Sequence, residues 1–294
     1  MDIDKEKYFE FVEPYIPLDK SWAIRIGVQD LLHGDVDNTI SQLENNQPLC
    51  DDLSVFKNIL ENWEETNLIN VGESGTLYRF FKYINWNYDL DKEFIVEGTL
   101  IDRKITDDPN VIFLKQKSLL QLDNQTSQWA SASVLCGDET RLIDPPFKLG
   151  LTYEAWGAWH TGEGNRHLIK DSTLRNQALT FMHLKEGSRP EFEAEQAEDY
   201  PFALTFEYLT VDEGLERWPS LVGHESNRII EMSKMLDNAK NGQEVSSKDH
   251  RIVQALGMWG LVNQVDIKFT NPNSVSKSWP KYWEFISAAD LPRV

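Results

Sequence analysis

Cysteine, basic residues and long apolar runs are all scarce in this chain. Its 294 residues include two cysteines, Cys50 and Cys136, which fit neither a disulfide framework nor the spacing of a zinc site. No stretch reads as a signal peptide, and no apolar run is long enough to span a membrane. These absences predict a soluble cytoplasmic protein.

Basic side chains are too few for an extended positive surface. Lys and Arg number 29 against 48 Asp and Glu, which gives a formal net charge of -19. Such a balance argues against nucleic acid or an anionic membrane as partner. Any anion that binds must be held by a local cluster of cations, and we expect small-molecule partners and a monomer.

Composition and patterning predict an α/β fold. Hydrophobic residues make up 40% of the chain and aromatic residues 11%, and this length suggests two domains or one large one. Strand-like and helix-like segments alternate. Strands are expected at residues 94–96, at residues 111–114 and along the alternating Val265, Ile267 and Phe269.

Amphipathic helices are expected between these strands. One covers residues 54–63, and another follows an apolar stripe with helical spacing. We interpret its aromatic residues as core rather than as a ligand platform. The stripe consists of Trp279, Tyr282, Trp283 and Ile286.

The stretch NVGESGTLYRFF, residues 70–81, places a glycine-rich loop directly before a helix-like run. Backbone N–H groups at a helix N-terminus favour anions, and Arg79, one turn in, would add a bidentate fork. Gly75 would let a ligand approach the backbone closely. The alternative is an ordinary turn in which this glycine only supplies a positive φ.

Other expected helix beginnings carry similar residues. Asp19 would cap a helix whose first turns contain Lys20, Ser21 and Arg25. If such N-termini converge, they would bind one anionic ligand; the alternative is coincidence, because Ser, Thr, Asp and Glu are ordinary first-turn residues. The remaining beginnings lie near Thr126-Ser127-Gln128, near Glu225 and Arg228, and at Asp249-His250-Arg251.

In chain order these residues form a motif series that resembles the 5-enolpyruvylshikimate-3-phosphate synthase family, the 3-phosphoshikimate 1-carboxyvinyltransferases. Each motif is weak alone, so the resemblance depends on their order, which runs from about residue 15 to 285. The series is Lys20-Ser21-x-x-x-Arg25, Gly72-Glu73-Ser74-Gly75-Thr76-x-x-Arg79, Asp102-Arg103, Thr126-Ser127-Gln128, Asp199, Glu225-x-x-Arg228, Asp249-His250-Arg251 and Lys277-Ser278-Trp279-Pro280.

The resemblance implies a two-domain, inside-out α/β barrel built from repeated β-α-β-α-β-β units. Residues 20–165 would form the first domain, and residues 1–19 with 166–294 the second. The chain is shorter than usual members of the family, with material missing most heavily between Trp156 and Asp199. A reduced second domain is therefore expected.

The family transfers the enolpyruvyl group of phosphoenolpyruvate to the 5-hydroxyl of shikimate 3-phosphate and releases phosphate, a step of aromatic amino acid biosynthesis that glyphosate inhibits. The resemblance implies that no metal or redox cofactor takes part. It places phosphoenolpyruvate against Lys20, Gly75, Arg103, Gln128, Arg228, Arg251 and Lys277. Shikimate 3-phosphate would meet Ser21, Arg25, Thr126, Ser127, Gln128 and Asp199. The catalytic residues would be Lys20, the base Asp199 and the proton carrier Glu225.

Several observations leave alternatives open. Arg103 and Arg251 each follow an aspartate closely, and the alternative for each is a solvated ion pair with that aspartate. Asp199 lies in an acidic run that is typical of a solvated face. His250 reads more readily as structural than as catalytic, while His160 and His167 lack a ligand cluster at metal spacing.

Departures from the family pattern bear on the acceptor. Residues 144–147 replace a phosphate-binding serine and a tyrosine with Asp144 and Phe147, and a usual basic residue is His224. The alternatives are therefore a carboxyvinyl transferase with another acceptor, or a non-catalytic paralogue that binds anions similar to phosphoenolpyruvate.

Overall fold

The computed structural model describes residues 5–122, 126–137, 149–161, 166–223 and 227–291. The chain divides into two compact units. The first unit comprises residues 18–169, and the second comprises residues 1–17 together with 170–294.

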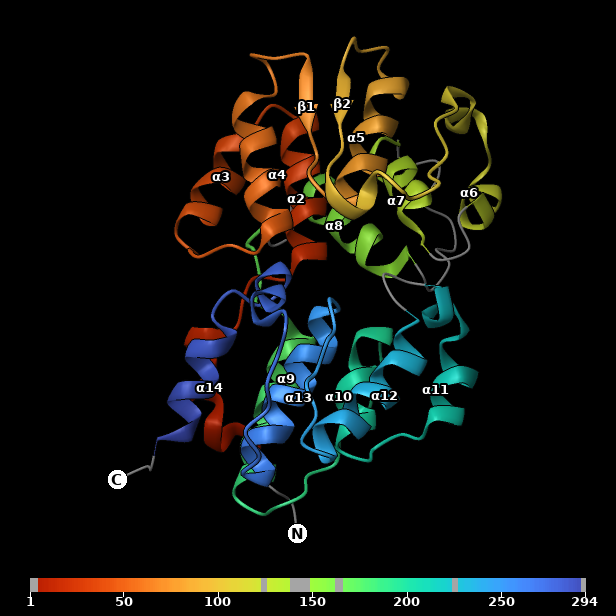
Figure 1. Cartoon of the computed structure of the whole chain (residues 1–294). Helices are drawn as coiled ribbons and strands as arrows, with labels where there is room; N and C mark the ends of the chain where they lie inside the picture. Colours follow the sequence, from red (N-terminus) through yellow and green to blue (C-terminus); the bar gives the residue numbers. More distant parts are fainter. Residues whose placement is uncertain (1–4, 123–125, 138–148, 162–165, 224–226, 292–294) are drawn as a thin grey trace. The chain divides into compact units, whose positions relative to one another are not determined.

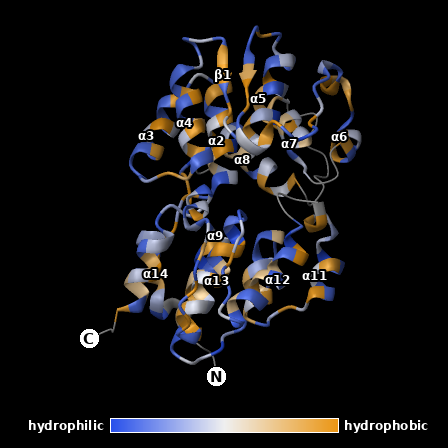
Figure 2. Cartoon of the chain, viewed as in Figure 1, coloured by the Kyte–Doolittle hydropathy of each residue, from blue (hydrophilic) through white to orange (hydrophobic). Residues whose placement is uncertain are grey.

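The first unit is a set of helices with one pair of short strands (Figure 1). Its helices pack through apolar faces, and Figure 2 shows hydrophobic and hydrophilic residues alternating around them. In chain order the elements are α2 (Lys20–Leu32), α3 (Val36–Glu44), α4 (Asp51–Asn62), β1 (Leu68–Asn70), α5 (Gly75–Asn87), β2 (Glu93–Ile95), the 3-10 helices η3 (Gly98–Leu100) and η4 (Pro109–Phe113), α6 (Gln116–Leu122), α7 (Gln128–Leu135) and α8 (Gly150–His160).

The second unit is helical in its described part. The segment that begins the chain packs with helices from its C-terminal half, so both ends contribute to one core. The elements are η1 (Lys5–Tyr8), α1 (Phe9–Val12), η2 (Glu13–Tyr15), α9 (Ser172–Lys185), η7 (Ala197–Asp199), α10 (Tyr200–Thr205), α11 (Val211–Arg217), η8 (Pro219–Gly223), α12 (Arg228–Lys240), α13 (His250–Asn263), η9 (Pro272–Lys277) and α14 (Tyr282–Asp290).

The fold is rich in α-helix, and no barrel is formed by the described residues. Their strands are limited to β1 and β2, which run parallel with Ile69 paired to Phe94. With α5 as the crossover helix, they make one βαβ unit, in which both strands end at the same edge. The expected strand at 94–96 is therefore confirmed, shifted by one residue, as β2.

Two of the expected strands are wrong. Residues 111–114 fall mostly in η4, where Pro109 removes a backbone donor and the Asp108 side chain accepts from the N–H of Asn110. Residues 265–269 follow the left-handed end of α13 at Gln264, φ 56°, and make one isolated bridge, between Val245 and Phe269. Ile267 and Phe269 instead pack on the apolar cluster formed with α12 and α13.

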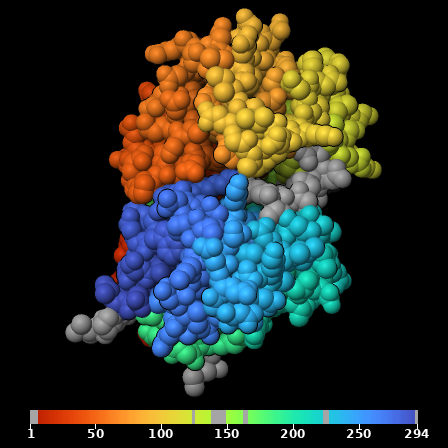
Figure 3. All heavy atoms as spheres, in the orientation of Figure 1, coloured from red at the N-terminus to blue at the C-terminus, as the bar shows by residue number. Residues whose placement is uncertain are grey.

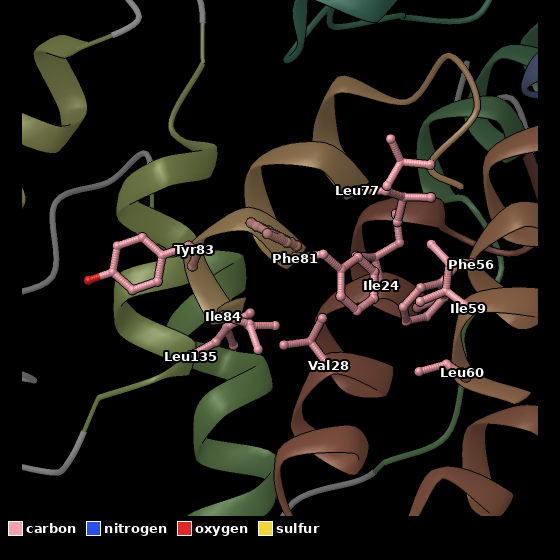
Figure 4. Close-up of a cluster of buried hydrophobic side chains, with 14 of the residues drawn as sticks. Ile24, Val28, Phe56, Ile59, Leu60, Leu77, Phe81, Tyr83, Ile84 and Leu135 are labelled. Carbon is pink, nitrogen blue, oxygen red and sulfur yellow. The ribbon is translucent and has the colours of Figure 1, made fainter. Parts of the chain in front are cut away.

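The core of the first unit brings together α2, α4, α5 and α7. Figure 4 shows Ile24 and Val28 of α2 facing Phe56 of α4 and Phe81 of α5, and the expected helix at 54–63 is confirmed as α4. In the space-filling view, the side chains of this orange-to-yellow part of the chain lie in direct contact on the viewed face (Figure 3). Cys50 and Cys136 are both free thiols.

The core of the second unit is rich in aromatic side chains. Trp279 and Tyr282 are fully buried and lie 5.3 Å apart between ring centroids, while Trp283 and Ile286 are partly buried against the same cluster. The stripe is thus core, as expected, although α14 begins only at Tyr282. Among the described helices, none has the length and apolar character needed to cross a membrane.

Trp279 also fixes the beginning of the chain, because its indole Nε1 donates to the carbonyl of Tyr15 at 2.7 Å. We expect Trp279→Phe to lower the free energy of unfolding by about 1–3 kcal/mol, since the carbonyl loses its donor and the smaller ring leaves a void. Urea unfolding of the full chain measures this loss. The control is Trp283→Phe, which removes a 2.8 Å bond to the Pro272 carbonyl at a more exposed position; an equal loss in both variants contradicts the prediction.

Candidate functional site

The candidate site of the first unit lies at the edge where the two parallel strands end. The loop after β1 leads into the N-terminus of α5, and the loop after β2 leads into η3. These loops are joined by backbone bonds, from Val71 N–H to the Ile95 carbonyl and from Glu97 N–H to the Gly72 carbonyl. Ligands of α/β folds commonly bind outside the carboxyl ends of parallel strands.

The GESGT loop forms a turn followed directly by a helix cap. Gly72 has φ +56°, a conformation that side chains disfavour, and its N–H donates to Asn70 Oδ1 at 2.8 Å. The Ser74 hydroxyl caps α5 by accepting from Leu77 N–H. The glycine that supplies the positive φ is therefore Gly72.

Gly75 is the first residue of α5 and has no positive φ, so the ordinary-turn interpretation of this glycine is wrong. A Cβ atom there would lie 2.8 Å from Arg79 Nη1 and 3.5 Å from Arg103 Nη1. The missing side chain thus makes room for two guanidinium groups at a helix N-terminus. Arg79 comes from α5 itself, and Arg103 from the segment after η3.

Arg79 connects this helix to α7. Its Nη1 donates to Gln128 Oε1 at 2.8 Å and to the Gly75 carbonyl at 3.1 Å. The Gln128 amide in turn donates to the Thr76 hydroxyl at 2.5 Å. The structure therefore gathers Gly75, Arg103 and Gln128, three of the expected phosphoenolpyruvate contacts, and adds Thr76 and Arg79.

One carboxylate also lies in this region. Glu73 Oε2 accepts from the N–H and the hydroxyl of Thr99, at 3.3 and 3.0 Å, and Arg103 Nη2 donates to the same hydroxyl at 3.0 Å. The negative charge of Glu73 opposes anion binding, but these bonds hold the loop after β2 against the loop after β1.

A second polar cluster surrounds Arg25 on α2. This guanidinium is buried, and it donates to the hydroxyls of Thr152 at 2.8 Å and Ser131 at 3.4 Å and to the Ser21 carbonyl at 2.8 Å. Burial lowers the pKa of Arg25 to about 10, although the negative charge of Asp19 acts in the opposite direction. Sequence analysis missed Thr152 and Ser131, because hydroxyl residues inside helices give no distinctive pattern.

The other first-unit residues of the expected site lie at helix beginnings. Asp19 caps α2 as expected, accepting from Trp22 N–H, while Lys20 pairs with Asp52 of α4 at 2.9 Å. Thr126 accepts from Gln128 N–H at 3.2 Å, and Ser127 is the N-cap residue of α7.

In the second unit, Arg228 and Asp249 form a buried ion pair. Arg228 Nε lies 2.7 Å from Asp249 Oδ2, and Nη2 lies 3.4 Å from Oδ1, so the fork expected to grip a ligand carboxylate faces an internal one. Asp249 also caps α13 by accepting from Arg251 N–H. The side chain that pairs with Asp249 is therefore that of Arg228, whereas Arg251 contributes its backbone.

The Arg251 side chain retains hydrogen-bonding capacity. Its Nε and Nη1 atoms are buried and have no hydrogen-bond partner among the described residues. Lys277 ends η9, next to Ser278, whose hydroxyl accepts from Gln254 at 3.0 Å. Glu225 and His224, like Asp144 and Phe147, lie outside the described residues.

Asp199 is buried, so the solvated-face interpretation is wrong for this residue. Its Oδ1 accepts from Gln177 at 2.8 Å, and its Oδ2 accepts from the N–H groups of Glu195 and Gln196 at 3.1 Å each. Burial raises the pKa of Asp199, whereas these hydrogen bonds and the charge of Arg251 act to lower it. A carboxyl group with a raised pKa is suited to general-base chemistry.

Comparisons with known proteins found no matching family model, curated protein or solved structure. Among the described residues there is also no group of three or more His, Cys, Asp or Glu side chains placed to hold a metal ion. Function is therefore inferred from the site's geometry and from the motif resemblance alone.

The raised pKa of Asp199 predicts a pH dependence of stability. Folding disfavours the ionised carboxylate, so this group lowers the free energy of unfolding. The loss is fully present above the pKa of Asp199 in the folded protein, and it disappears as the pH falls toward the ordinary value of 3.8. Relative to Asp199→Asn, whose amide does not titrate, the wild-type protein should gain stability as the pH falls through the raised pKa of the folded state toward 3.8.

Urea unfolding at a series of pH values measures this difference. Asp237→Asn, at an exposed position of α12, is the control and should leave the pH profile unchanged. If the stability difference between wild type and Asp199→Asn grows in favour of the variant on acidification, the burial argument is wrong.

Proposed function

We propose that the first unit binds a small anion with the chemistry of phosphoenolpyruvate, a phosphate and a carboxylate on one carbon skeleton, at the N-terminus of α5. The observation that carries this proposal is the gathering of Gly75, Thr76, Arg79, Arg103 and Gln128 at the carboxyl edge of the β1–β2 pair.

The physical chemistry of this cluster favours a phosphate. The backbone N–H groups of the first turn of α5 and its positive dipole end attract an anion. Two guanidinium groups bring positive charge and N–H donors that suit phosphate oxygens, although the two protons of Arg79 Nη1 already bond to Gly75 and Gln128. Gln128 and Thr76 add neutral polar groups, and the missing side chain of Gly75 leaves room for the two guanidinium groups at the helix N-terminus.

The reaction that we propose for this ligand is enolpyruvyl transfer with release of phosphate, the activity of the synthase family that the motif series resembles. The acceptor is shikimate 3-phosphate or another hydroxyl compound. Ser21, Arg25, Thr126 and Ser127 would hold it. For the base of this reaction the motif resemblance proposes Asp199, and the raised pKa of its buried carboxyl suits that chemistry.

The finer fold assignment belongs to the same proposal. Five of the eight motifs lie at the N-termini of α2, α5, α7, α12 and α13, the positions that an anion-binding α/β repeat would use. We propose that the chain derives from two synthase-like domains in which strands other than β1 and β2 have been reduced. A cytoplasmic location is also proposed, in keeping with two free thiols.

The second candidate function is binding of the same anion without turnover. It is favoured by two ion pairs within the chain, Lys20 with Asp52 and Arg228 with Asp249. In each pair a carboxylate of the protein itself binds a cation that a transferase of this class would use to bind its substrate. Removing one partner of the buried pair would be strongly unfavourable.

One experiment tests both candidates. Phosphoenolpyruvate at one hundred times its dissociation constant should stabilise the native state by about 2.7 kcal/mol, measured as a shift of the melting curve. Phosphate release from phosphoenolpyruvate is then followed with and without shikimate 3-phosphate. Binding with release supports the transferase, binding without release supports the second candidate, and melting curves unchanged by millimolar ligand refute both.

Gly75→Ala tests the geometry of the site. The new methyl group would lie 2.8 Å from Arg79 Nη1, so the guanidinium must move, and we expect phosphoenolpyruvate affinity to fall at least tenfold, about 1.4 kcal/mol. Binding of glyphosate should weaken as well. Stability should not fall by a comparable amount, because alanine suits a helix better than glycine.

Gly150→Ala is the matched control. Gly150 is likewise the first residue of its helix, α8, and among the described residues a Cβ atom there would meet nothing within 4 Å. Calorimetric titration and a melting curve are measured on both variants. A lower melting temperature of Gly75→Ala with unchanged affinity would assign this glycine to packing and remove it from the site.

A further inference from the structure

Two exposed histidines meet where α2 and α8 end. His33 is the C-cap residue of α2, and His160 is the last residue of α8. Their ring centroids are 5.3 Å apart with an interplanar angle of 75°. Both belong to the first unit, but α2 is 13 residues long, which separates this pair from Lys20 by about 20 Å.

Hydrogen bonds determine which nitrogen of each ring carries the proton. His33 Nδ1 lies 2.7 Å from the Gln29 carbonyl, and His160 Nδ1 lies 2.9 Å from the Trp156 carbonyl. A carbonyl oxygen only accepts, so Nδ1 is the donor in both rings. The neutral rings therefore keep their lone pairs on Nε2, the arrangement by which a carbonyl orients a metal-binding histidine.

Aromatic contacts hold both rings in place. His33 stacks on Trp159 at 4.4 Å, and His160 stacks on Trp156 at 3.8 Å, with interplanar angles of 9° and 5°. The Arg166 guanidinium also lies over the Trp159 ring, with Cζ 4.2 Å from its centroid, and Arg166 is paired with Asp35 at 2.8 Å. The imidazoles are thus restrained before any ligand arrives, which lowers the entropy lost on binding.

The spacing of the rings fits two ligands of one metal ion. An imidazole that binds through Nε2 at about 2 Å has its ring centre about 3 Å from the metal, so two such rings at a tetrahedral angle lie about 5 Å apart. The C-terminal ends of α2 and α8 also carry partial negative charge, which favours a cation.

We propose that His33 and His160 form a binding site for a divalent transition-metal ion, with water as the remaining ligands. Imidazole ligands select Cu²⁺, Ni²⁺ and Zn²⁺ over Mg²⁺ and Ca²⁺, and Cu²⁺ binds tightest of the first-row ions. The site is independent of the proposed anion site and of enolpyruvyl transfer.

Titration of the full chain with Cu²⁺, Ni²⁺, Zn²⁺ and Mg²⁺ tests the proposal, with tryptophan fluorescence and calorimetry as readouts. We expect one saturable site for Cu²⁺, quenching because Trp156 and Trp159 stack on the ligands, weaker binding of Ni²⁺ and Zn²⁺, and none of Mg²⁺. His33→Gln and His160→Gln should each weaken Cu²⁺ binding at least tenfold. His167→Gln, at another exposed histidine of this unit, should leave it unchanged.

A measurement on the wild-type protein guards against variants that misfold. Electron paramagnetic resonance of the Cu²⁺-loaded protein should show coordination by two imidazole nitrogens. Single-imidazole coordination, or equal Cu²⁺ affinity in wild type and both glutamine variants, overturns the proposal. Loss of phosphoenolpyruvate binding has no bearing on it.

Discussion

The packing of α5 against α7 is the constraint on which the polar architecture of the first unit depends. Toward the C-terminal end of α5, Trp86 stacks on Trp129 at 5.7 Å; nearer its N-terminus, on the same face, Arg79 bonds to Gln128. The two contacts lie about two turns apart on α5, so the helix cannot rotate or slide without breaking one of them. This restraint determines where Gly75, Thr76 and Arg103 lie relative to α7, and therefore whether their donors act together.

Helix beginnings were the part of the fold that the sequence predicted best. At three of them the side chains of Asp19, the one predicted cap, Ser74 and Asp249 each accept from an N–H within three residues along the chain, so the signal and the structure lie in the same short segment. The wrong strands at 111–114 and 265–269 failed for the opposite reason. An alternating or apolar run shows that side chains are buried, but whether they pack on a sheet or on a helix depends on distant residues.

The same distinction explains what was missed in the candidate sites. Arg228 could be predicted at a helix beginning, but not that its guanidinium meets Asp249 across 21 positions. Gly75 could be predicted at a helix beginning, but not that the guanidinium groups of Arg79 and Arg103 lie beside it. Thr152, from α8, gave no signal, because a hydroxyl inside a helix becomes informative only when a buried arginine lies beside it.

Helix polarity gives the first unit two chemically distinct ends. α2 and α8 are in contact, and Arg25 bonds to Thr152 near their N-termini, while His33 meets His160 at their C-termini. The helices therefore run parallel, and their dipoles add. Partial positive charge at one end favours anions, whereas partial negative charge at the other favours cations. A chain with net charge -19 repels anions at long range, so an anion site in it must depend on local charges such as the N-termini of α2 and α5. The proposed cation site at His33 and His160 has no such requirement, because there the net charge and the helix dipoles act in the same direction.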